Sequence, residues 1–160
     1  MMPRYEVLAR RIEQELADLE RTVSVIRRHW EKAVTAATDQ DAYLNSVALN
    51  LHGLYSGLER VFELIAVEID GGTLGGDAWQ AELLRQMTVE VPDVRPAVLQ
   101  PDTASALDDL RRFRHRIRNI YATNLDPERV KPLVTGLPAL WQRLRENLGA
   151  FVGFLHHLGR

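Results

Sequence analysis

Apolar residues at helical spacing constrain the fold of this chain more than any other feature. Between Tyr5 and about Ala37 they recur at steps of three and four, at Val7, Leu8, Ile12, Leu16, Leu19, Val23, Ile26 and Trp30. This spacing puts them on one face of a long amphipathic helix. Thr38-Asp39-Gln40-Asp41 then supplies candidate N-cap residues for a second helix, from about Ala42 to Ile69. We therefore expect an antiparallel hairpin of two long helices.

Glycine and proline divide the rest of the chain. The glycines at 71–72 and 75–76 end the second helix, because glycine readily adopts the left-handed conformation that closes a helix. A shorter helix is predicted over about 78–87. Three prolines between 91 and 101 exclude a regular helix there, so this stretch is predicted to be a surface connection.

Two further helices are predicted in the last third. The first is capped by Thr103 or Ser105 and ends near Asn124. The second follows Asp126-Pro127, a cap followed by a proline at the first helical position, and Gly136 and Pro138 predict a kink in it. Because no stretch alternates like a strand, the expected fold is all-α, an antiparallel bundle of four to five helices in a single domain over 1–160.

Composition restricts the chemistry. Twenty Lys and Arg against twenty-two Asp and Glu give a formal charge of -2, so any contact with nucleic acid must be local. The chain has no cysteine, which excludes disulfides, thiolate nucleophiles and zinc sites with sulfur ligands. No apolar run is long enough to span a bilayer, and the start is too charged for a signal peptide. We expect a cytoplasmic protein without metal or cofactor.

The stretch 111–118 is unusual because it holds five arginines in eight residues and no acid. On a helix, one arc carries Arg111, Arg114, His115, Arg118 and Asn119. Guanidinium groups bind phosphate bidentately and stabilise charge on a phosphorus undergoing displacement, while histidine exchanges a proton near neutral pH. The pattern indicates phosphoryl transfer. The alternative is a solvated basic face whose arginines pair with acids on neighbouring helices.

These residues and three other segments resemble the HepT-like toxin branch of the HEPN superfamily. The family's signature is Arg, four residues, His, one residue and Tyr, with a polar residue commonly after the Arg. Arg114, His115, Asn119 and Tyr121 stand at the matching positions, with Asn119 where His is expected. Further similarity lies in 52–62, in 79–87 and in 125–129.

The resemblance implies a homodimeric, metal-independent endoribonuclease that cuts RNA at a composite site between two copies and leaves a 2′,3′-cyclic phosphate. It implies catalytic roles for Arg114, His115, Asn119 and Tyr121. RNA binding is assigned to three of the four other arginines of the stretch, Arg111, Arg116 and Arg118. The implied partner is a minimal nucleotidyltransferase antitoxin, which in some cases adds AMP to the motif tyrosine, here Tyr121.

Asn119 departs from the signature because an amide cannot act as a general acid or base. Either His115 substitutes for the missing histidine, or Asn119 orients the scissile phosphate while arginines stabilise its charge. The alternative is a catalytically inactive helical module that binds its partner nucleotidyltransferase or RNA without cleavage. His52 and Glu59, seven residues apart on one helix face, are weaker candidates that either line the cleft or bind a neighbouring backbone group.

Overall fold

The computed structural model describes residues 3–72, 75–117 and 125–159. Its elements are α1 (Pro3–Thr35), α2 (Gln40–Ile65), the π-helical turn η1 (Ala66–Asp70), α3 (Trp79–Met87), α4 (Pro101–Ile117) and α5 (Pro127–Leu158). Across these residues there is no β-strand, only an isolated β-bridge between Val91 and Arg95. The predicted all-α bundle of four to five helices is confirmed, with five α-helices in these residues.

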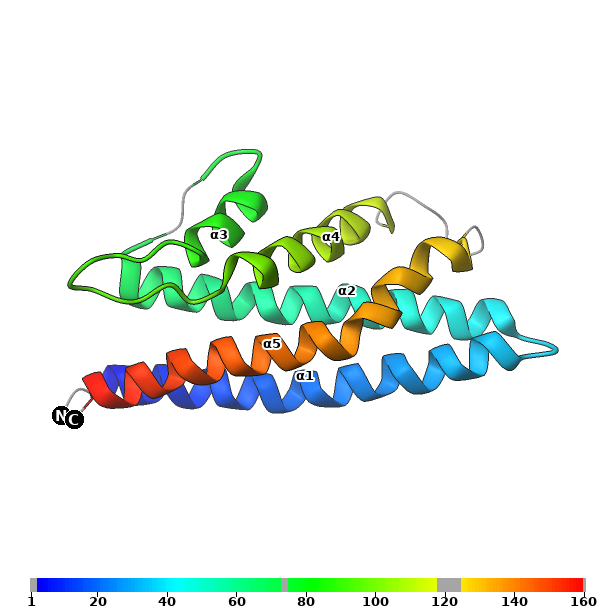
Figure 1. Cartoon of the computed structure of the whole chain (residues 1–160), viewed down its shortest axis with the longest axis horizontal. Helices are drawn as coiled ribbons and strands as arrows, with labels where there is room; N and C mark the ends of the chain where they lie inside the picture. The colour runs from blue at the N-terminus through cyan, green and yellow to red at the C-terminus, as the bar shows by residue number, and fades with distance from the viewer. Residues whose placement is uncertain (1–2, 73–74, 118–124, 160) are drawn as a thin grey trace.

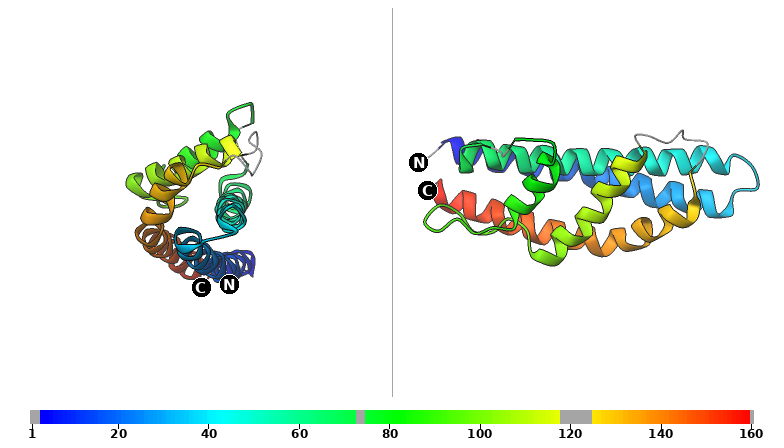
Figure 2. Two further views of the ribbon diagram at one scale, coloured as in Figure 1. Left: turned by 90° about the vertical axis from the view of Figure 1, so that its right-hand side faces the viewer. Right: turned by 90° about the horizontal axis from the view of Figure 1, so that it is seen from above.

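The long helices form a bundle. α1 and α2 make the predicted antiparallel hairpin, and α5 lies along α1 (Figure 1). α4 packs against both α2 and α5, and the short α3 contacts α2 and α4, so the two shorter helices form a second layer over the hairpin (Figure 2). Within the described ranges, no helix is long and apolar enough to cross a membrane.

A single cluster of buried apolar side chains runs through all five α-helices. The largest fully buried members include Ile12 and Ile26 of α1, Tyr55 and Phe62 of α2, and Phe151 of α5. Most positions of the predicted stripe in α1 are buried as expected. Val7 is an exception, with 57% of its surface exposed, because its neighbour Leu8 takes the core-facing position.

Close packing of α1 on α2 depends on Gly57. A Cβ atom at this position would lie 2.6 Å from Leu19 Cδ2 and 2.9 Å from Glu15 Oε1. Both distances are too short for a stable contact, so a larger residue would push the helices apart or force α1 side chains to move. Arg60, one turn later, donates to Glu15 Oε1 at 2.9 Å across the same contact.

The turn between α1 and α2 lies where it was predicted but closes differently. Asp39 precedes α2 with a φ of 64°, and its side chain makes no capping hydrogen bond. The side-chain amide of Gln40 instead donates to the carbonyl of Ala33 at 2.8 Å, which satisfies an acceptor at the end of α1. The predicted side-chain N-cap is therefore wrong, because Asp39 occupies the left-handed region that aspartate tolerates in a tight turn.

Helix α4 begins at Pro101, before the predicted caps. Proline is tolerated in the first turn, where a backbone N–H has no helical partner. Just before it, the N–H of Gln100 donates to Asn147 Oδ1 of α5 at 2.8 Å. Thr103 is buried within the first turn, so neither Thr103 nor Ser105 is the cap. The predicted end of this helix near Asn124 lies outside the described residues.

Helix α5 begins as predicted. The side chain of Asp126 accepts a hydrogen bond from the N–H of Glu128 at 3.0 Å, and Pro127 occupies the first helical position. The helix continues through Pro132 and Pro138 to Leu158, and its N-terminal half bends (Figure 1). Because proline removes a helical hydrogen bond, the bend has a local cause in these residues.

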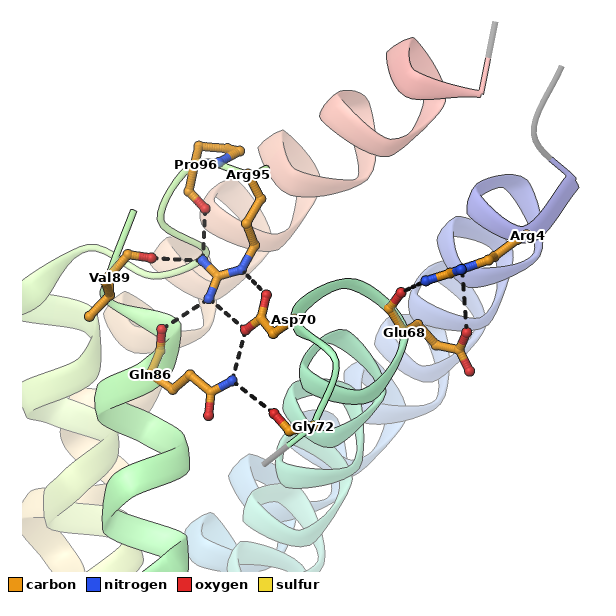
Figure 3. Close-up of polar contacts among 8 residues, drawn as sticks. All are labelled: Arg4, Glu68, Asp70, Gly72, Gln86, Val89, Arg95 and Pro96. Atoms are coloured by element: carbon orange, nitrogen blue, oxygen red, sulfur yellow. Dashed lines mark hydrogen bonds and ion pairs between the residues drawn. The ribbon is translucent and has the colours of Figure 1, made fainter. Parts of the chain in front are cut away.

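A buried ion pair anchors the connection between α3 and α4 (Figure 3). Arg95 Nε and Nη2 donate to the two carboxylate oxygens of Asp70, at 2.6 and 2.8 Å. The remaining donors reach the carbonyls of Gln86, Val89 and Pro96. Burial raises the pKa of Asp70, but hydrogen bonds from Arg95 and Gln86 outweigh that effect and lower it. The connection is therefore tied to the end of η1.

Candidate functional site

The C-terminal half of α4 carries the described part of the arginine-rich stretch. Leu107, Leu110 and Phe113 are buried and fix this face of α4 against the bundle. Arg114 follows Phe113 and turns toward α2, where it is only 8% exposed. The predicted phosphate-binding arginine therefore lies at the contact between two helices.

Three side chains of α2 hold the guanidinium of Arg114. Its Nη1 atom lies 3.3 Å from Glu59 Oε1 and 3.4 Å from Ser56 Oγ. Its central carbon lies 5.1 Å from the ring centroid of Tyr55, within the range of a cation–π contact. Glu59 is 8% exposed, so this ion pair is largely shielded from water. The charge of Arg114 is therefore balanced within the fold.

Tyr55 is an uncharged member of this cluster. Burial raises the pKa of the Tyr55 hydroxyl, and the nearby charge of Glu59 raises it further, while Arg111 and Arg114 act in the opposite direction. The net pKa stays far above neutrality. Tyr55 therefore keeps its proton and presents an uncharged aromatic face to the guanidinium.

Asp108 neutralises part of the neighbouring positive charge. Arg111 Nε lies 2.8 Å from Asp108 Oδ1, and Arg112 Nη2 lies 2.6 Å from Asp108 Oδ2. Burial raises the pKa of Asp108, but hydrogen bonds and charge from both arginines outweigh it and lower the pKa. The stretch itself has no acid, yet an acid one turn earlier and one on α2 pair with three of its arginines. The pair of Arg114 with Glu59 on α2 is the kind expected for a basic face paired with neighbouring helices, whereas Asp108 lies on the same helix as Arg111 and Arg112.

The other predicted site residues divide into two groups. His115 and Arg116 are exposed at the end of α4. Arg118, Asn119 and Tyr121 lie outside the described residues. The structure thus brings Arg114 together with α2 and leaves His115 and Arg116 on a different side of the same helix.

Tyr55 and Ser56 were not predicted as site residues, whereas Glu59 was a weak candidate together with His52. A signal for them exists in the sequence. The residues at 52, 55, 56 and 59 recur at steps of three and four, and hydroxyl, imidazole and carboxylate groups at that spacing form one polar stripe along the helix. Such a stripe predicts a polar contact with another helix.

The hydrogen bonds of Arg114 engage one nitrogen of its guanidinium. Among the residues that the structure describes, both of its hydrogen bonds pass through Nη1. The opposite edge of a guanidinium, formed by Nε and Nη2, is the fork that binds two phosphate oxygens. Over the described ranges, no group of three or more histidine and acidic side chains is arranged to hold a metal ion.

A family model described as HepT-like protein matches residues 46–155. The match runs from the second turn of α2 nearly to the end of α5, so it includes all the contacts of Arg114 described above. No curated protein matches this chain. No solved structure matches it.

Proposed function

This chain belongs to the HepT-like family, and on that premise we propose that it is a metal-independent endoribonuclease toxin of a HEPN/MNT toxin–antitoxin pair. It acts in the cytoplasm as a single domain that pairs with a second copy. RNA is cut at a composite site between the two copies.

The position of Arg114 carries this proposal. It stands where the family signature has its arginine, and α2 fixes its guanidinium through Tyr55, Ser56 and Glu59. A guanidinium held in place before the substrate arrives stabilises developing charge without further reorganisation. An arginine with this support is better suited to a phosphate than one that moves freely on the surface.

The proposed reaction is an intramolecular transesterification. The 2′-hydroxyl of RNA loses its proton and attacks the adjacent phosphorus, the bond to the 5′-oxygen breaks, and that oxygen takes up a proton. The products are a 2′,3′-cyclic phosphate and a 5′-hydroxyl. Arg114 and Arg118 stabilise the additional negative charge, and His115 transfers a proton. Asn119 orients the phosphate, and Tyr121 positions the RNA.

A dimer supplies the electrostatics that one copy lacks. Arg111, Arg112 and Arg114 are paired with acids in the single copy, and the whole chain carries a formal charge of -2. A two-fold axis beside the end of α4 would bring Arg116 and Arg118 of both copies to one groove, where a polyanion can bind. The proposed antitoxin, a minimal nucleotidyltransferase, would block this groove by adding AMP to Tyr121.

A second candidate function is an inactive HEPN module that binds its partner nucleotidyltransferase or RNA without cleavage. Two observations favour it. Asn119 replaces the histidine of the signature, and Arg114 is already paired with Glu59 at 3.3 Å. In this case Arg114 would serve the fold alone.

An RNA cleavage assay in the presence of EDTA separates the two functions. For the enzyme, we expect wild-type cleavage and a loss of about 10²-fold for Arg114→Lys, which keeps the charge opposite Glu59 but loses the planar fork. Arg112→Lys, on the same helix and exposed, is the matched control and should cut like the wild type. Cleavage that appears only after Asn119→His would instead establish the inactive module.

A further inference from the structure

Glu59 is difficult to explain by stability. Placing a carboxylate and a guanidinium at a helix contact with 8% exposure removes both charges from water, and this desolvation penalty can exceed their mutual attraction. Replacing a buried ion pair by apolar residues of similar volume is often neutral or stabilising. The pair is therefore better explained if Arg114 is needed and Glu59 serves to hold it.

The contacts on Arg114 also restrict its orientation. The central carbon of the guanidinium lies 5.1 Å from the ring centroid of Tyr55, and Glu59 and Ser56 both accept from Nη1. A ring contact and one anchored nitrogen limit the orientations that the guanidinium can take. All three residues lie within two turns of a helix that packs against both α1 and α4, so the support is itself rigid.

We infer that Glu59 is a positioning residue that holds the Arg114 guanidinium with its Nε–Nη2 edge toward a phosphate of bound RNA. This inference rests on the proposed function, and it adds a role for a residue outside the arginine-rich stretch. In this role Glu59 does not touch the substrate and acts through Arg114. Ser56 assists at the same nitrogen, with a weaker effect because it is a neutral acceptor.

The first test compares the cleavage kinetics of Glu59→Gln with those of Asp70→Asn, which weakens the other buried arginine–carboxylate pair. We expect Glu59→Gln to lower kcat about 10-fold to 10²-fold and to raise KM about 10-fold, because a displaced guanidinium binds the phosphate more weakly and also stabilises the developing charge less well. Asp70→Asn should keep the wild-type kcat at a temperature where it is folded. A kcat for Glu59→Gln within twofold of the wild type, or equal to that of Asp70→Asn, overturns the inference.

A double-mutant cycle tests whether Glu59 acts through Arg114. In an Arg114→Lys background, adding Glu59→Gln should lower kcat less than threefold, because the fork that Glu59 orients is already lost. An equal loss in both backgrounds overturns the inference. If Glu59→Gln does not fold, Ser56→Ala takes its place, with an expected loss of about threefold in kcat. An unchanged rate would then be the contrary result.

Binding separates a failure of this inference from a failure of the proposed function. The probe is a short RNA with 2′-deoxy substitutions, which cannot be cleaved by 2′-hydroxyl attack, and its affinity is measured by fluorescence anisotropy. If the wild type binds this RNA but cuts no RNA, the ribonuclease proposal fails. The inference about Glu59 still stands in that case if Glu59→Gln binds the RNA about 10-fold more weakly than Asp70→Asn does. Equal affinities of the two variants overturn the inference alone. Absence of binding by the wild type overturns both.

Discussion

Among the residues that the structure describes, two buried arginines pair with carboxylates, and their contacts differ. Arg95 donates through Nε, Nη1 and Nη2, to both oxygens of Asp70 and to three backbone carbonyls. Arg114 donates through Nη1, at 3.3 and 3.4 Å, in the part of the chain that the structure describes. An arginine whose N–H groups are all hydrogen-bonded within the protein has a structural role. An arginine that is hydrogen-bonded through one nitrogen has other N–H groups that can donate to a ligand.

The largest effect on stability is expected at the arginine with the most contacts. Arg95→Met leaves Asp70 without its partner and three carbonyls without donors, so the free energy of unfolding should fall by about 3–5 kcal/mol. Urea denaturation followed by circular dichroism measures this loss. A loss below about 1 kcal/mol would mean that the connection between α3 and α4 contributes little to the fold.

A smaller loss is expected at Arg114. Arg114→Met retains an apolar side chain against Tyr55 but leaves Glu59 without this cation, which should cost about 1–3 kcal/mol. The same denaturation experiment compares it directly with Arg95→Met. If Arg114→Met were the more destabilising of the two, the distinction between a structural and a ligand-binding arginine would fail.

The smallest effect is expected at the partly exposed cluster of His156 with Glu6 and Glu13, and it depends on pH. His156 Nδ1 lies 2.8 Å from Glu6 Oε1 and its Nε2 lies 3.0 Å from Glu13 Oε1, so both contacts are hydrogen bonds only when the ring is an imidazolium. Hydrogen bonds to Glu6 and Glu13 raise the pKa of His156. This contribution to stability is therefore complete below the unfolded pKa and is lost as the pH rises through the folded pKa.

His156→Gln should consequently lower the thermal midpoint at pH 6 and have no effect at pH 9. His157→Gln, one residue further on, is the matched control. A shift of the same size at both pH values would show that His156 contributes through packing rather than through its charge.

Much of the fold could be predicted because its signals are local. Helical periodicity marked the long helices, and Asp126-Pro127 marked the start of α5 from two adjacent residues. The errors arose where several local solutions compete. Asp39 was expected to cap with its side chain, yet its backbone adopts the left-handed conformation. Pro101 was taken as part of a non-helical connection, although proline is equally suited to a first helical turn.

The site was harder to predict because its partners are distant in sequence. The arginine-rich stretch is visible as composition, but which acids neutralise it depends on packing. Arg114 and Glu59 are 55 residues apart, and only the crossing of α2 and α4 brings them together. Asp108, in contrast, is close in sequence to its partner, because it lies three residues before Arg111, a spacing at which helical residues are neighbours. Pairwise helical spacing could have identified it.

The packing of α1 has a practical consequence for anyone who shortens this protein. The family match begins at residue 46, so α1 lies outside it, yet α1 packs against both α2 and α5. A fragment trimmed to the matched boundaries would lose Ile12 and Ile26 and expose the apolar side chains of α2 and α5 that share the core with them. An exposed apolar surface of this kind favours self-association. Recombinant fragments should therefore retain the first helix if they are to stay in solution.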